Sequence, residues 1–228
     1  MQESAHTAGA QHKPVRVHGR KRGHRLSIAA RQALEGLLPI LSAPLECAAK
    51  DPALLFSHHP SGVWLEIGFG DGGHLLWAAR SRPHAGFIGC EPYVNGVANL
   101  LHRIALEGLG NIRIHAGDAR ILMGTLPARS IAGVFILFPD PWPRKRHHKR
   151  RFISNENLDA LARVLRPGAE LHFASDSPDY CQWTLAHIQA HPDFTEARHE
   201  RGGAPLTKYE ARAQAEGRSA QHLRFIRI

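Results

Sequence analysis

Residues 138–143 read FPDPWP and place one carboxylate, Asp140, between two prolines. The prolines restrict the backbone to extended or turn geometry, so the carboxylate is held in place at low entropic cost. A cationic run follows directly at 144–151 and reads RKRHHKRR. A fixed carboxylate beside dense positive charge favours chemistry on a polyanion, and Trp142 either lines a base pocket or packs against the core.

A glycine-rich turn at 66–73, with the sequence EIGFGDGG, is the second candidate for chemistry. Gly68, Gly70 and Gly73 satisfy the GxGxxG spacing, which permits a tight turn and close backbone approach by a nucleotide. Glu91 follows at about the distance of a ribose-binding acid. The turn alone does not separate NAD from S-adenosylmethionine.

Two further acids favour S-adenosylmethionine as the cofactor. Glu66 lies two residues before the first glycine, and Asp118 occurs in the stretch HAGDA. A cofactor with an amino-acid group, a ribose and an adenine offers donors to several carboxylates. Asp118 has a second interpretation as a plain helix cap, whereas Glu66 within a strand would bury a charge that needs a partner.

Charge and composition indicate one core and a basic partner surface. The chain has 228 residues, 43% of them hydrophobic, which suffices for one well-filled core. Its net charge of +9 favours a polyanionic partner. No acid lies between Glu3 and Glu35, so we expect a basic arm at 1–25, either functional or merely disordered, and a single domain at 26–228.

Cysteines and histidines give no sign of a metal site or a disulfide framework. Cys47, Cys90 and Cys181 are far apart and odd in number, and His187 and His191 have no evident third ligand. No signal-peptide core follows the basic N-terminus, and no segment reaches membrane-spanning length. We therefore expect a cytoplasmic protein with no metal and no membrane association.

The elements that must position these residues alternate between strand and helix. Strands are predicted at 63–67, 86–90, 111–117, 131–138 and 169–174, and helices at 74–81, 95–108, 154–165 and 179–190. The strand at 131–138 is apolar on both faces, as a central parallel strand must be. Pro167 and Gly168 are predicted to end the helix before them.

The C-terminal part of the pattern predicts an antiparallel pair of strands at 194–198 and 222–228. The whole is a doubly wound, Rossmann-like α/β sheet. Ligands bind such sheets outside the carboxyl ends of the strands. The candidate residues above follow predicted strands and would meet at that edge.

Over residues 63–228 the chain resembles the bacterial tRNA (guanine-N7)-methyltransferases, which are class I S-adenosylmethionine-dependent enzymes. The likeness rests on LEIGFGDG, CEP, GDA, FPDPWPRKRHHKRRF, SDSPDY and TKYE, in that order. The glycine turn is shared by most class I methyltransferases, whereas FPDPWP with its basic tail is specific to this family.

The resemblance implies methyl transfer to N7 of a guanosine in tRNA. Asp140 would be the catalytic residue, and the cofactor would contact Glu66, Gly68, Gly70, Glu91, Asp118 and Asp140. Substrate contacts would be Arg144, Asp176, Thr207, Lys208, Tyr209 and Glu210, and the RNA backbone would lie against Arg146, Lys149, Arg150 and Arg151. Arg144 departs from the family's usual lysine: the charge is kept, but the donor geometry differs.

Other interpretations remain open at this point. The Pro-Asp-Pro-Trp segment loosely resembles the loop of methyltransferases that act on exocyclic amino groups. A non-catalytic RNA-binding protein is the other alternative, and it is disfavoured because an intact cofactor loop would then have no evident use. The additional acids disfavour an oxidoreductase. Asp140 is either an orienting group or a general base, and the protein is either a monomer or a homodimer.

Overall fold

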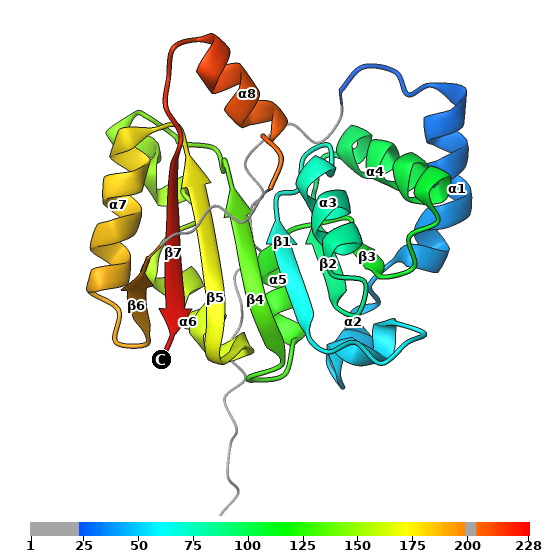
Figure 1. Cartoon of the computed structure of the whole chain (residues 1–228), viewed down its shortest axis with the longest axis horizontal. Helices are drawn as coiled ribbons and strands as arrows, with labels where there is room; N and C mark the ends of the chain where they lie inside the picture. The colour runs from blue at the N-terminus through cyan, green and yellow to red at the C-terminus, as the bar shows by residue number, and fades with distance from the viewer. Residues whose placement is uncertain (1–22, 199–203) are drawn as a thin grey trace, which may run out of the picture.

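The computed structural model describes residues 23–198 and 204–228, and within them seven strands form one sheet. The strand order is β3-β2-β1-β4-β5-β7-β6 (Figure 1). The strands are β1 (Val63–Ile67), β2 (Gly86–Cys90), β3 (Ile112–His115), β4 (Ile131–Leu137), β5 (Leu165–Ser175), β6 (Phe194–Ala197) and β7 (Gln221–Arg227).

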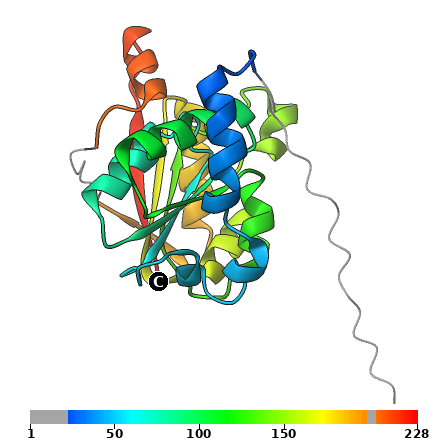
Figure 2. The same ribbon diagram turned by 90° about the vertical axis from the view of Figure 1, so that its right-hand side faces the viewer.

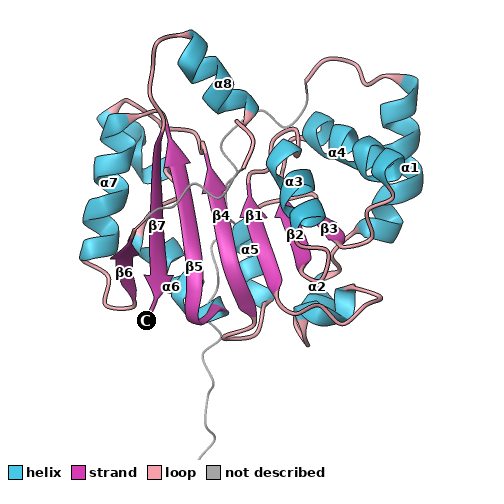
Figure 3. Cartoon of the chain, in the orientation of Figure 1, coloured by secondary structure: helices cyan, strands magenta, loops and turns pink. Residues whose placement is uncertain are grey.

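Helices alternate with the strands and cover the sheet (Figure 3). They are α1 (Ile28–Leu41), α2 (Leu45–Ala48), α3 (Gly73–Ser81), α4 (Val94–Glu107), α5 (Ala119–Thr125), α6 (Asn155–Val164), α7 (Pro178–Gln189) and α8 (Lys208–Ala215), with 3-10 turns η1 (Pro52–Leu55) and η2 (Lys145–Arg150). The predicted doubly wound α/β fold is confirmed. The segments α1, α2 and η1, which precede the first strand, were not predicted.

The sheet separates two apolar cores, and Figure 2 views it nearly along its edge. One core joins the sheet to α5, α6 and α7, and the other joins it to α1, α3 and α4. Successive residues of β4 serve both: Val134 packs in the first core and Phe135 in the second. The central strand is therefore apolar on both faces, as its sequence predicts.

The predicted antiparallel ending is also confirmed. β7 pairs antiparallel with β5 on one side and with β6 on the other, with Phe173 opposite Leu223 and Thr195 opposite Ile226. The strands β1 to β5 pair in parallel, so their carboxyl ends meet at one edge. In Figure 1 α8 lies above that edge.

One predicted boundary is wrong. Pro167 and Gly168 lie inside β5 and do not end the preceding helix, because α6 ends at Val164 and Leu165 is already extended. The register between β4 and β5 shifts between Ile131 and Gly133, and this irregular start accommodates the proline and the glycine, whose φ is 80°. Most of the predicted arm at 1–25 lies outside the described residues, so the division at residue 25 stays a prediction.

Candidate active site

A cavity of about 540 Å³ opens at the carboxyl ends of the parallel strands. β1 pairs with β2 on one side and with β4 on the other, so the strand order reverses here, which is where doubly wound sheets bind ligands. Five of the six residues predicted to contact the cofactor share its wall: Gly68, Gly70, Glu91, Asp118 and Asp140. Lys208, Tyr209, Arg150 and Arg151 line it as well.

The glycine turn needs glycine for its backbone conformation. Gly68, Gly70 and Gly72 have φ values of 74°, 59° and 77°, in the left-handed region that side chains disfavour. The amide of Gly72 donates to the carbonyl of Phe69 at 2.9 Å, which closes the turn directly before α3. The backbone of Gly68 and Gly70 is thereby presented to the cavity.

Glu91 clamps this turn to the end of β2. Its Oε2 accepts a hydrogen bond from the amide of Gly70 at 2.8 Å, and its Oε1 accepts one from the amide of Tyr93 at 2.9 Å. Burial raises the pKa of Glu91, while the two amide donors act in the opposite direction. Both oxygens keep further lone pairs, so the carboxylate can fix the turn and still accept from a ligand.

Asp118 combines a helix-capping hydrogen bond with a place in the cavity wall. It caps α5, accepting from the amide of Arg120 at 2.9 Å, and it lines the cavity. Burial alone would raise the pKa of Asp118, but the hydrogen bonds from Arg120 outweigh it and hold the pKa below its ordinary value. The carboxylate is therefore charged over the physiological range.

Glu66, predicted to be a cofactor ligand, lies apart from the other residues of that prediction. It is buried at 3% exposure and does not line the cavity. Its Oε2 lies 2.8 Å from Nδ1 of His74, the partner that a buried charge on this strand requires. Because side chains on a strand alternate between faces, Glu66 points toward the α3 side of the sheet.

The loop that carries Asp140 has an unusual backbone on both sides of it. Phe138 and Trp142 have φ values of 51° and 44°, although neither is glycine. Such conformations cost on the order of 1–3 kcal/mol each and persist only where surrounding contacts enforce them. Asp140 as a residue is exposed, but its carboxyl group borders the cavity, where partial desolvation raises its pKa above the ordinary value.

The basic run divides into exposed and buried parts. Arg144, Arg146 and Lys149 are exposed on and beside η2, and we call these three residues the exposed strip. Arg150 is half-buried, with its guanidinium 4.8 Å from the centre of the Trp142 ring. Arg151, predicted to contact the RNA backbone, has a fully buried side chain, so the structure does not place it among the exposed cations.

Of the TKYE segment and Asp176, only two residues line this cavity. Lys208 and Tyr209 line it, whereas Thr207 caps α8 and, like Glu210, faces a second cavity of about 450 Å³. Glu210 is buried and lies 3.0 Å from Nε2 of His222. Asp176 pairs with Arg218 and lines neither cavity.

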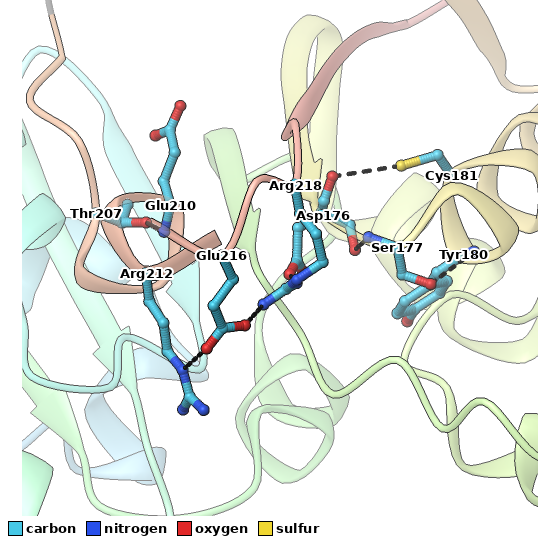
Figure 4. Close-up of polar contacts among 10 residues, drawn as sticks. Asp176, Ser177, Tyr180, Cys181, Thr207, Glu210, Arg212, Glu216 and Arg218 are labelled. Atoms are coloured by element: carbon cyan, nitrogen blue, oxygen red, sulfur yellow. Dashed lines mark hydrogen bonds and ion pairs between the residues drawn. The ribbon is translucent and has the colours of Figure 1, made fainter. Parts of the chain in front are cut away.

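Figure 4 shows how Asp176 is connected to the end of α8. Arg218 contacts both Asp176 and Glu216, and Glu216 also accepts from Nε of Arg212 at 2.8 Å. This chain of charges joins the segment after β5 to the segment after α8. In this arrangement Asp176 helps to hold α8 over the strand ends.

Sequence analysis missed Gly96, which sits in the first turn of α4. A Cβ at this position would lie 2.1 Å from the carbonyl oxygen of Gly70, so the helix and the glycine turn touch through backbone. The signal was available, because a glycine within a helical pattern is costly and usually has a packing reason.

We expect Gly96→Ala to weaken cofactor binding more than tenfold, because the new methyl group must displace the glycine turn. Helix propensity alone predicts the opposite sign, a gain of up to about 1 kcal/mol in stability. Gly36→Ala is the matched control, since Gly36 lies in α1 with open space around its Cβ position. Calorimetric titration with S-adenosylmethionine measures the affinity. Equal affinities in both variants would show that the contact between Gly96 and Gly70 does not matter for binding.

Among the described residues, no helix is long and apolar enough to cross a membrane. No cluster of three His, Cys, Asp or Glu side chains suited to a metal ion occurs at 23–198 or 204–228.

The sheet order and the glycine turn at its switch point define a methyltransferase of the class I type. The family described as "Putative methyltransferase" matches residues 61–223. A tRNA (guanine-N(7)-)-methyltransferase of Nitrobacter hamburgensis is 45% identical over 217 residues, which cover 92% of this chain and 85% of the relative. One of Bradyrhizobium diazoefficiens is 42% identical and covers 92% of each chain. The chain belongs to the tRNA (guanine-N7)-methyltransferase family.

Solved structures of other methyltransferases share the fold. The 16S rRNA methyltransferase KamB matches with a TM-score of 0.55 and 19% identity, over 74% of this chain and 89% of that one. TrmN from Thermus thermophilus matches with a TM-score of 0.53 and 18% identity, over 74% of this chain and 45% of that one. At such identities the likeness concerns the fold alone, and it confirms the class I architecture.

Proposed function

We propose that the protein transfers the methyl group of S-adenosylmethionine to N7 of a guanosine in tRNA. The observation that carries the proposal is a single cavity that joins the glycine turn to the Asp140 loop. The glycine turn and Glu91 line it together with Asp140, and the exposed strip follows Asp140 directly in the chain. The family membership and the tRNA named for its relatives support the same reaction.

The residues at the cavity fit the cofactor. Gly68 and Gly70 present backbone without side chains, and Glu91 and Asp118 supply acceptors for hydroxyl and amino groups. A volume of about 540 Å³ lies within the range of small-molecule sites. When bound, the cofactor supplies a methyl group that its sulfonium already activates.

Asp140 is assigned the orienting role. Guanine N7 carries an unprotonated lone pair at neutral pH, so transfer requires alignment more than proton removal. A carboxylate at the cavity edge accepts hydrogen bonds from the edge of the base and stabilises the positive charge that develops on the ring. The exposed strip holds the phosphates of the tRNA. The protein would act in the cytoplasm, where this substrate is found.

The product decides between this reaction and methylation of an exocyclic amine. Total tRNA is incubated with the protein and S-adenosylmethionine, digested, and analysed by nucleoside mass spectrometry. We expect 7-methylguanosine. A product methylated on an exocyclic amine would contradict the proposal, since that reaction must also remove a proton. Cofactor binding without any product would favour a non-catalytic RNA-binding role.

We expect Glu91→Gln to weaken cofactor binding by about 10- to 150-fold, or 1.5–3 kcal/mol. Both oxygens of Glu91 accept from backbone amides, so the amide nitrogen of glutamine would face a donor and break one of the two bonds. Calorimetry with S-adenosylmethionine measures the change. Glu107→Gln, at the far end of α4, serves as the control, and equal affinity in both variants would refute the assignment.

A further inference from the structure

Arg151 departs from the rest of the basic run in its burial and in its partners. Its side chain is 0% exposed, and its Nε donates to the carbonyl oxygen of Pro141 at 2.9 Å. Its Nη2 donates to Asp179 in the first turn of α7. The guanidinium thus connects the residue that follows Asp140 to a helix on the far side of the loop.

Two aromatic rings complete the surroundings of this guanidinium. Its central carbon lies 4.8 Å from the centre of the Tyr180 ring and 5.1 Å from that of Trp183. The hydroxyl of Tyr180 in turn accepts from the amide of Ile153 at 3.2 Å. A planar cation held by rings and by two acceptors is oriented in a way that a flexible lysine could not match.

The loop needs such support, because its backbone is in left-handed conformations on both sides of Asp140. At the first of these, the amide of Phe138 donates to the carbonyl of Ala174 at 2.7 Å, which ties the loop to β5. Beyond Asp140, the bond from Arg151 to Pro141 ties it to α7. Without the second tie, the carboxylate at the cavity edge would be fixed from one side only.

We propose that Arg151 is a positioning residue that holds Asp140 in place through the Pro141 carbonyl, with Asp179 as its anchor, and is not a contact to tRNA phosphate. What Asp140 does there rests on the proposed function. The bond from Arg151 also holds the pKa of Asp179 below its ordinary value, so the anchor stays charged well into the acid range.

The informative variant is Arg151→Lys, because it keeps the positive charge and loses the two-sided donor geometry. We expect single-turnover methyl transfer at saturating tRNA and cofactor to fall on the order of 10²-fold, as small misplacements of a reacting group do. The salt dependence of tRNA affinity should match the wild type. Wild-type transfer in Arg151→Lys would overturn the proposal. A phosphate contact tolerates lysine, whereas the contact of Arg151 with both Pro141 and Asp179, which we call the latch, does not.

Asp179→Asn tests the same latch from its other end and leaves the buried arginine in place. We expect the same loss of single-turnover rate with unchanged salt dependence. Lys149→Ala, in the exposed strip, should differ from both variants by lowering the slope of log tRNA affinity against log salt by about one. If Asp179→Asn instead behaved like Lys149→Ala, the pair would belong to tRNA binding and the proposal would fail.

Hydrogen exchange separates this inference from the proposed function. Peptides that cover 138–153 should exchange faster in Arg151→Lys and Asp179→Asn than in Lys149→Ala, whether or not the wild type methylates tRNA. Unchanged exchange in both latch variants would overturn the positioning role. Absence of 7-methylguanosine with the wild-type protein would refute the reaction while leaving the exchange result to judge the latch.

Discussion

Asp140→Ala is expected to lower methyl transfer on the order of 10²–10³-fold, with tRNA affinity changed only slightly. The reason is that charge stabilisation aimed at a developing charge is of that size in other enzymes. In the proposed function tRNA binding depends on the exposed strip, so the loss of one carboxylate should change the affinity little. Single-turnover transfer at saturating tRNA and cofactor measures the effect without a contribution from binding.

Asp140→Asn distinguishes the two roles for this residue. Asparagine keeps the shape and one acceptor, so an orienting role predicts clearly more residual transfer than in the alanine variant. Equal, near-background rates in both variants would favour an obligatory base, and wild-type rates in both would remove Asp140 from the reaction. Asp159→Asn is a suitable control, because its exposed side chain lies on α6 and lines neither cavity.

The wild-type rate should also depend on pH through Asp140. Desolvation raises the pKa of this carboxyl group, so it gains its proton at a higher pH than a free aspartate does. The rate of methyl transfer should therefore be highest well above that pKa and should decline as the pH falls through it. The decline should vanish in Asp140→Asn, which has no proton to gain.

Replacing the exposed strip, Arg144, Arg146 and Lys149, by alanine should weaken tRNA binding on the order of 10²-fold near 0.1 M salt. Each phosphate contact releases counterions and contributes about 0.9 to the slope of log affinity against log salt, so three contacts lower the slope by roughly 2.7. Binding isotherms at several salt concentrations measure both numbers. Cofactor affinity should be unchanged.

A matched set of three exposed cations controls for net charge. Lys50, Arg129 and Arg166 are exposed, and Arg129 and Arg166 lie at the amino ends of the strands, away from the cavity. Their replacement removes the same charge. If the salt slope fell equally in both triple variants, the net positive charge of the protein would explain tRNA binding. An unaltered slope in the variant of the exposed strip would show that the strip is only a solvated surface.

Apolar periodicity predicted the strands and the helices α3, α4, α6 and α7, because the central strands are buried on both faces and each helix packs one apolar face on the sheet. It did not predict α1, α2, α5 or α8. It also predicted that Gly68, Gly70, Glu91, Asp118 and Asp140 would meet, since they follow parallel strands whose carboxyl ends share an edge. What the sequence could not give was the direction of individual side chains beyond that edge.

Two residues illustrate this. Glu66 belongs to the glycine motif but turns to His74, and Arg151 belongs to the basic run but turns inward to Asp179. Their partners lie eight and 28 residues away, and a charged run gives no sign of which member is buried. Gly96 shows the reverse, a residue outside every motif that touches the site through backbone alone.

The position of β7 between β5 and β6 has a consequence for synthesis on the ribosome. β6 is synthesised before β7, and β7 is its only partner in the described sheet. β6 therefore has no strand to pair with until β7 has been made. Until residues 221–227 emerge, one side of β5 presents unpaired backbone, the kind of edge that associates with other chains. β5 supports the Asp140 loop through Ala174, so a nascent chain could build that loop while the strand beneath it is still open on one side.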